Sequence, residues 1–205
     1  MSQELFEMIR QMDLKDTELQ LALQCAPLIS GLKLSNLLIV QPDQLKEVKH
    51  ILRGTKICCQ VLLVTEEKAT VLLYDQERLN EYLSEARVAE LLRKMGYQSQ
   101  DLNEILPVFR LRYQTYMEEK RAFPHEMGVL LGYPIEDVEG FIKNNGQDFL
   151  CTGYWKVYGN LPAKEKLFQR FEHVKETMIQ LISCGMSVVD IIDIYSEGKT
   201  QKIAG

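Results

Sequence analysis

The hydrophobic positions of the chain follow two patterns, helical periodicity and short continuous runs, which together predict a small sheet among helices. In residues 5–12 and 16–26 apolar side chains return every third or fourth position, which predicts two amphipathic helices. Residues 36–40 form a short apolar run that is typical of a buried strand. Residues 56–64 and 69–74 are β-rich runs separated by the polar segment 65–68, which predicts a hairpin.

A short helix is predicted between the first strand and the hairpin. It begins near Pro42 and turns Leu45, Val48 and Leu52 inward. A strand, a crossover helix and a hairpin make a βαββ unit. Because proline lacks an amide hydrogen, Pro27 is expected to kink or stop the second helix near Cys25.

From residue 76 onward the apolar residues follow mainly a helical periodicity. One predicted helix ends at Gly96, and the next begins either after Asp101 or at Pro107. Two more are predicted, one after Pro162 and one from Ser187. The fold class predicted is therefore α+β: a small mixed sheet packed with a mostly helical C-terminal two-thirds. With neither a linker nor a repeat, residues 1–205 are expected to form a single α+β domain with a flexible tail at 197–205.

Composition narrows the functional classes. The chain has 205 residues, 46% of them hydrophobic, and a net charge of −5, so neither nucleic acid nor an anionic membrane is an expected partner. No apolar run reaches the roughly 18 residues of a membrane helix. The cysteines are odd in number and scattered, without an export signal, which favours reduced thiols and a cytoplasmic location. The oligomeric state is left open.

The first segment that carries chemistry is residues 123–142, with His125 and Glu126 adjacent. A zinc protease motif requires a second histidine four residues later, but Val129 stands there. His125 and Glu126 remain an acid–base pair or, alternatively, His125 only caps the turn after Pro124. The spacing also predicts a helix-turn-helix unit. As a DNA reader it is disfavoured, since its second helix carries more carboxylates than cations.

The second segment, residues 151–159, contains Cys151, Tyr154, the only tryptophan (Trp155), Lys156 and Tyr158 between glycines. Such aromatics wall a ligand pocket, with Lys156 pairing an anionic group, or else fill the edge of the core. Both interpretations stay open from the sequence.

The third segment, residues 25–36, contains Cys25, Lys33 and Asn36. A thiol near a helix C-terminus has a raised pKa, which argues against a nucleophile unless Lys33 lies close by. Cys58 and Cys59 are adjacent on a strand and point to opposite faces, and there is no CxxC pair, P-loop or dinucleotide-binding glycine signature. No cofactor is therefore assigned, and no metal site is predicted.

Together the three segments resemble a bacterial family, a domain of unknown function common in clostridial-type anaerobes. The motifs FPHE-G-LGYP-DV-GF (123–141) and C-GYWKVYG (151–159) carry the resemblance, and CAP-G-K-N (25–36) matches more weakly. The resemblance covers nearly the whole chain and implies membership without an activity. The reactive side chains that match these blocks are Cys25, Lys33, Asn36, His125, Glu126, Tyr133, Asp137, Cys151, Tyr154, Trp155, Lys156 and Tyr158.

These residues lead to a hypothesis of one pocket for a small, anionic molecule. His125, Glu126 and Cys151 are its candidate catalytic groups. The candidate ligand-binding residues are Lys33, Asn36, Tyr133, Tyr154, Trp155, Lys156 and Tyr158. Whether the protein is an enzyme stays open. The alternatives are a metal or tetrapyrrole handling protein with His125, Cys25 or Cys151 as ligands, and a regulatory protein-interaction module built on the helix-turn-helix unit.

Overall fold

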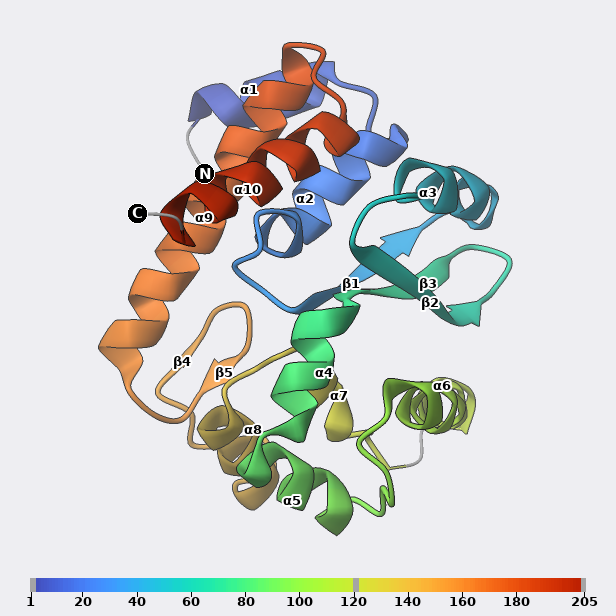
Figure 1. The fold of residues 1–205 in the computed structure, drawn as a ribbon, viewed down its shortest axis with the longest axis vertical. Coiled ribbons are helices and arrows are strands. Elements are labelled where there is room, and N and C mark those ends of the chain that lie inside the picture. The colour runs from blue at the N-terminus through green and yellow to red at the C-terminus, as the bar shows by residue number, and fades with distance from the viewer. Residues whose placement is uncertain (1–2, 120–121, 204–205) are drawn as a thin grey trace. The chain divides into compact units, whose positions relative to one another are not determined.

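The computed structural model describes residues 3–119 and 122–203 and confirms the α+β fold class (Figure 1). None of the described helices is long and apolar enough to cross a membrane. The elements, in chain order, are α1 (Gln3–Gln11), α2 (Thr17–Ile29), β1 (Ser35–Val40), η1 (Pro42–Gln44), α3 (Leu45–Ile51), β2 (Ile57–Val64), β3 (Ala69–Asp75), α4 (Gln76–Ser84), α5 (Ala86–Lys94), α6 (Leu102–Glu119), α7 (Glu126–Leu130), α8 (Ile135–Lys143), β4 (Cys151–Thr152), β5 (Lys156–Val157), α9 (Leu161–Ser183) and α10 (Val188–Ile203).

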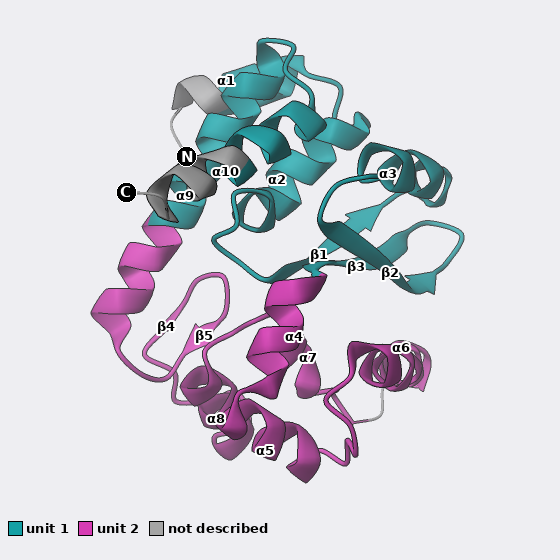
Figure 2. Cartoon of the chain, in the orientation of Figure 1, with its two compact units in different colours: residues 1–75, 170–205 teal, residues 76–169 magenta. Residues whose placement is uncertain are grey.

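The chain divides into two compact units (Figure 2). Unit 1 comprises residues 1–75 and 170–205, and unit 2 comprises residues 76–169. Helix α9 contributes to both. That the whole chain is a single domain stays a prediction. The expected flexible tail at 197–205 lies partly outside the described residues, and α10 is helical to Ile203.

Unit 1 contains the predicted βαββ unit, with one difference in strand direction. The order is β1-β3-β2, and both pairings of this sheet are antiparallel, so the sheet is not mixed as expected. The crossover through α3 makes β1 and β2 parallel to each other, but β3 lies between them and runs the opposite way. Because the hairpin places β3 between these two parallel strands, each neighbouring pair of strands in the sheet is antiparallel.

The core of unit 1 lies against one face of this sheet. Leu38 on β1 faces Val71 on β3, and both are fully buried together with Ala22 of α2. Helices α3, α9 and α10 add Val48, Met178 and Ile191 to the same cluster. Because side chains alternate across a strand, this pattern places every second residue of β1 and β3 in the core.

The outer edge of β1 is closed by a side chain of α2. The Gln24 amide donates from Nε2 to the Ile39 carbonyl and accepts from the Ile39 N–H at its Oε1, each over 2.8 Å. This amide therefore satisfies both backbone groups that a further strand would pair with at this position.

Two prolines lie inside helices: the expected stop of α2 near Cys25 is wrong, whereas the expected start of α6 after Asp101 is confirmed against the alternative start at Pro107. Helix α2 continues past Pro27 to Ile29 because Leu28 and Ile29 are buried in the core, and Ser30 N still donates to Ala26 O over 2.9 Å. Helix α6 begins at Leu102, well before Pro107. Tertiary packing outweighs the single hydrogen bond that each proline removes.

Unit 2 is helical apart from one short hairpin. Helices α7 and α8 form the predicted helix-turn-helix unit across the turn at residues 131–134. Strands β4 and β5 pair antiparallel, with Cys151 opposite Val157. These two features supply most of the residues of the site described next.

Candidate functional site

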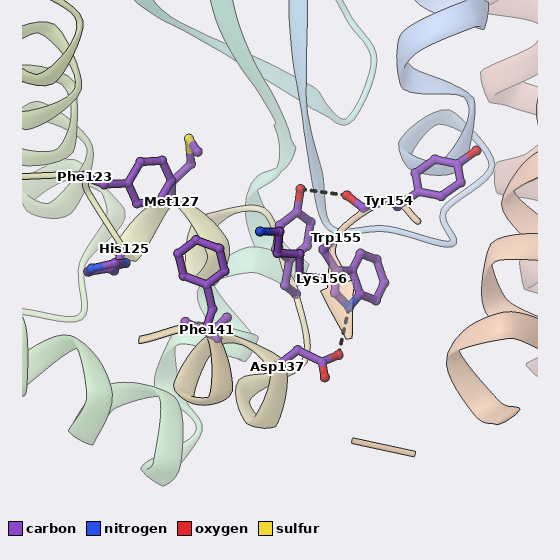
Figure 3. Close-up of a pocket in the computed structure, with 11 residues that line it drawn as sticks. Phe123, His125, Met127, Asp137, Phe141, Tyr154, Trp155 and Lys156 are labelled. Atoms are coloured by element: carbon purple, nitrogen blue, oxygen red, sulfur yellow. Dashed lines mark hydrogen bonds between the residues drawn. The ribbon is translucent and has the colours of Figure 1, made fainter. Parts of the chain in front are cut away.

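A cavity of about 160 Å³ lies within unit 2, between the α7–α8 unit and the β4–β5 hairpin (Figure 3). Its described lining residues all belong to the segments that the sequence singled out around His125 and Trp155. The lining residues are Phe123, His125, Met127, Gly128, Tyr133, Asp137, Val138, Phe141, Tyr154, Trp155 and Lys156.

Aromatic rings dominate the wall. On one side, the ring centroid of His125 lies 5.4 Å from that of Phe123 and 5.9 Å from that of Phe141. On the other side, Tyr133 and Trp155 stack with their centroids 4.9 Å apart. These separations are in the range that aromatic pairs favour, so the rings hold each other in place around the cavity.

His125 lines the cavity and, among the described residues, has one unpaired ring nitrogen. It occupies the N-cap position of α7, yet its side chain makes no capping hydrogen bond, which is the role the simpler interpretation gave it. Its Nδ1 is buried and has no hydrogen-bond partner among the described residues. Buried polar atoms in folded proteins are almost always paired, so this nitrogen is an exception, but it is enclosed by the protein and is not presented to the cavity.

Lys156 contributes a positive charge to the lining of the cavity. Its Nζ donates to the carbonyl oxygen of Gly146 over 2.7 Å and lies 4.7 Å from the Phe149 ring centroid and 5.8 Å from that of Phe141. An ammonium group has three donors. The contacts within the described ranges engage one of them in a hydrogen bond, which leaves donors available for an anion.

Asp137 lines the cavity but is fully engaged by the protein. Its Oδ2 accepts from Trp155 Nε1 over 2.8 Å, and its Oδ1 accepts from the backbone N–H groups of Tyr158 and Gly159 over 2.7 and 3.2 Å. Lys164 Nζ lies 3.7 Å from Oδ2. The carboxylate thereby fixes Trp155 and the β5 end of the hairpin to α8, and we assign it a structural role.

Two glycines let the hairpin approach its neighbours closely. A Cβ at Gly140 on α8 would lie 2.5 Å from Cβ of Tyr158, and one at Gly153 would lie 2.5 Å from Cδ2 of Phe168 on α9. Real Cβ atoms do not approach so closely, so both positions depend on the absence of a side chain.

The structure brings five of the predicted site residues to one cavity. They are His125, Tyr133, Tyr154, Trp155 and Lys156. The Tyr133 hydroxyl lies 3.5 Å from the Tyr154 carbonyl oxygen, and burial raises its pKa, so it stays neutral at physiological pH. Figure 3 shows the Tyr154 ring turned away from Phe141, and it packs instead on Phe168, with centroids 5.6 Å apart.

Glu126 does not line this cavity. Its carboxylate is 3% exposed and accepts from the Tyr97 hydroxyl over 3.0 Å and from Arg112 over 3.2 Å. These contacts tie α7 to α6 and to the end of α5. A catalytic partnership of Glu126 with His125 stays a prediction that no contact supports.

Cys151 and Tyr158 lie next to the site without lining it. Cys151 is half-buried on β4, and Tyr158 packs its ring against Gly140. The Tyr158 hydroxyl is buried without a hydrogen-bond partner among the residues that the structure describes. Their assigned roles, as a thiol and as a pocket wall, also stay predictions.

Lys33 and Asn36 belong to unit 1, where they form a polar cluster with Cys25. Lys33 Nζ donates to Asn36 Oδ1 over 3.0 Å. Burial raises the pKa of the Cys25 thiol to about 12, which exceeds the lowering by the nearby Lys33 charge. Cys25 is therefore a protonated thiol at neutral pH, as its place toward the helix C-terminus indicated. Burial lowers the pKa of Lys33 to about 8.

This cluster makes the stability of unit 1 depend on pH. Between pH 8 and 9 the unfolded chain keeps the Lys33 proton that the folded state loses, so the free energy of unfolding should rise with pH, by up to about 1 kcal/mol. Above pH 9 the Cys25 thiol contributes with the opposite sign, because only the unfolded chain loses that proton. Urea unfolding followed by far-UV circular dichroism measures the rise, and Lys33→Met should remove it. A rise that persists in Lys33→Met would contradict the assignment.

A metal site finds no geometric support in the described ranges. No group of three His, Cys, Asp or Glu side chains comes together there in a way that would hold a metal ion. Of the ligands proposed for the metal or tetrapyrrole alternative, Cys25 is in unit 1, whereas His125 and Cys151 are in unit 2.

Sequence reasoning missed the apolar part of the wall. Phe123, Met127, Val138 and Phe141 all line the cavity. Phe123, Val138 and Phe141 belong to the motif at 123–141, and Met127 lies within it, but apolar side chains there are expected to face a helix partner. Nothing in the pattern distinguishes a wall of that kind from a filled core.

A family model described as "Protein of unknown function (DUF3793)" matches residues 21–192, a span that contains every residue of the cavity. No curated protein and no solved structure matches the chain.

Proposed function

The chain belongs to the DUF3793 family of proteins of unknown function, and from the geometry of unit 2 we propose that it binds a small organic anion with an apolar body. The observation that carries this proposal is the meeting of aromatic side chains, His125 and Lys156 around one cavity. Ligand pockets typically combine a mostly apolar lining with a few convergent polar groups.

The charges near the cavity support an anion. Among the described residues, Asp137 is the only carboxylate in its lining, and it already accepts hydrogen bonds from Trp155 and from two backbone N–H groups. Lys156 has donors left over from its contact with Gly146. A carboxylate ligand therefore meets an available cation, whereas a cationic ligand would meet Lys156 without an available counter-charge.

The contacts support binding more directly than catalysis. Glu126 is held by Tyr97 and Arg112, and Cys151 does not line the cavity, so His125 has neither proposed catalytic partner beside it there. A protein-interaction surface on α8 also has less support. Among the side chains that the structure describes, α8 carries none of the exposed large apolar residues, and the cavity lies beside it. We also propose that the protein acts in the cytoplasm, which its five free thiols support.

The binding proposal is tested with benzoate and with the fluorescence of Trp155, the only tryptophan, which lines the cavity. Benzoate should change this fluorescence with saturation, whereas neutral benzamide should bind about tenfold more weakly. Lys156→Met should weaken benzoate binding by at least about tenfold, because it removes a charge-assisted contact.

The matched control is Lys143→Met, the same exchange at an exposed lysine of α8 that does not line the cavity. It should leave benzoate binding unchanged. Equal effects of the two variants, or saturable binding of benzamide that equals that of benzoate, would overturn the anion assignment.

A further inference from the structure

Lys156 connects the cavity with residues 144–150, the mostly exposed segment that joins α8 to β4. The lysine is part of the lining, and Figure 3 shows its amino end beside the Phe141 ring. The same ammonium group donates to the Gly146 carbonyl oxygen over 2.7 Å and lies 4.7 Å from the Phe149 ring centroid. Two residues that are not among the lining residues therefore hold the cation of the proposed anion site.

The backbone of this segment adopts an unusual conformation, in which the Gly146 carbonyl oxygen reaches Lys156. Gly146 has a φ of 71°, and Asn145 and Asp148 also have positive φ values, 49° and 54°. Residues other than glycine adopt this region uncommonly, although asparagine and aspartate do so more readily. Gly146 N donates to Phe141 O over 2.9 Å, and a Cβ at Gly146 would lie 3.1 Å from the Phe141 ring. The segment is thus fixed to the helix that carries one wall of the cavity.

Holding the ammonium group is important because a lysine side chain is long and flexible. A free lysine loses rotamer freedom when it binds an anion, whereas one that is already held loses less. The face of an aromatic ring attracts an ammonium group, so the Phe149 ring favours this position of Nζ. The bond to Gly146 uses one of the three donors of the ammonium group and leaves others for an anion.

We propose, on the basis of the function proposed above, that Phe149 is a positioning residue that holds the Lys156 ammonium at the cavity for the anionic group of the ligand. Phe149 is 38% exposed and is not among the lining residues, so its ring acts through the lysine and not as part of the apolar wall. Its removal should therefore weaken the binding of an anion and leave the binding of a neutral analogue unchanged.

The test is a titration of the full chain with benzoate and with benzamide, followed by Trp155 fluorescence. Phe149→Leu keeps an apolar side chain but removes the ring. It should weaken benzoate binding about threefold, the effect of one partly exposed contact between a cation and a ring. Benzamide binding should not change, so the ratio of the two affinities should fall from about ten to about three. Phe149→Tyr keeps the ring and should retain the ratio of the unmodified protein.

A double-mutant cycle separates positioning from a general structural effect. In the Lys156→Met background, Phe149→Leu should have no effect on benzoate binding, because the cation that it positions is gone. The matched control is Phe6→Leu, the same exchange at a half-exposed phenylalanine of α1 in unit 1. It should leave both affinities unchanged.

Several results would overturn the positioning role while leaving anion binding intact. They are an unchanged or increased benzoate affinity in Phe149→Leu, an equal weakening of benzoate and benzamide, and the same weakening in the Lys156→Met background. A loss in Phe149→Tyr as large as that in Phe149→Leu would also contradict the ring contact. Absence of saturable benzoate binding in the unmodified protein would overturn the proposed function itself, and with it this inference.

Discussion

Replacing Asp137 by alanine should lower the free energy of unfolding of unit 2 by about 3–5 kcal/mol. The carboxylate is 2% exposed and accepts three hydrogen bonds, one from Trp155 Nε1 and two from the backbone of Tyr158 and Gly159. Alanine leaves all three donors without their acceptor in a buried place. It also removes the nearby negative charge from Lys164, which is itself buried.

Urea unfolding followed by Trp155 fluorescence measures this loss within unit 2, because the indole is one of the groups that Asp137 holds. The matched control is Glu136→Ala, the adjacent carboxylate, which is about half exposed and pairs with Lys164 over 2.7 Å. A partly exposed ion pair contributes about 1 kcal/mol or less. Equal losses in the two variants would show that Asp137 is not the residue that fixes the hairpin.

Replacing Gly140 by alanine should destabilise unit 2 by at least about 2 kcal/mol, although alanine is the better helix former by about 1 kcal/mol. The new Cβ would lie 2.5 Å from Cβ of Tyr158 and closer still to Cγ. Those atoms are next to the Tyr158 backbone, whose N–H is bonded to Asp137, so they have little freedom to move.

Urea unfolding with the same fluorescence signal measures the effect. At Gly159 an added Cβ would meet Cγ of Glu136 at 3.5 Å, an ordinary contact, so Gly159→Ala should be much less destabilising. A double-mutant cycle adds a second check. Tyr158→Gly should cost less in the Gly140→Ala background than in the unmodified protein, because it removes the overlap. Additive effects would contradict the close approach.

Local patterns in the sequence predict the elements of this fold better than their arrangement. The β-rich runs indicate β2 and β3, and Pro42 indicates the crossover helix. That β3 lies between β1 and β2 depends on long-range pairing, which periodicity does not encode. For the same reason Pro27 was expected to interrupt α2, although the burial of Leu28 and Ile29 keeps the helix intact.

For the candidate site, too, the sequence indicates individual residues better than the contacts between them. His125, Trp155 and Lys156 stand out as residue types that carry chemistry, and the structure places all three on one cavity. Glu126 was paired with His125 because the two are adjacent. Successive residues at a helix start point in directions about 100° apart, so Glu126 contacts Arg112 instead.

Asp137 is a residue whose structural role its local sequence pattern does not indicate. Because it lies on a helix with several carboxylates, its sequence pattern predicts a place on an acidic surface that disfavours DNA. In the structure Glu136, Asp137 and Glu139 contact Lys164, Trp155 and Arg87, respectively. An acidic residue that accepts hydrogen bonds from a distant hairpin has the same local pattern as one that faces water, so the sequence alone does not separate them.

The amide of Gln24 has a consequence for how this protein behaves in concentrated solution. Exposed sheet edges act as templates on which further chains polymerise. At Ile39 both backbone groups are already occupied by that amide, so an incoming strand would first have to displace a helix side chain and break two hydrogen bonds. At Ile39 a single glutamine thereby blocks the pairing of a further strand with this edge of the sheet.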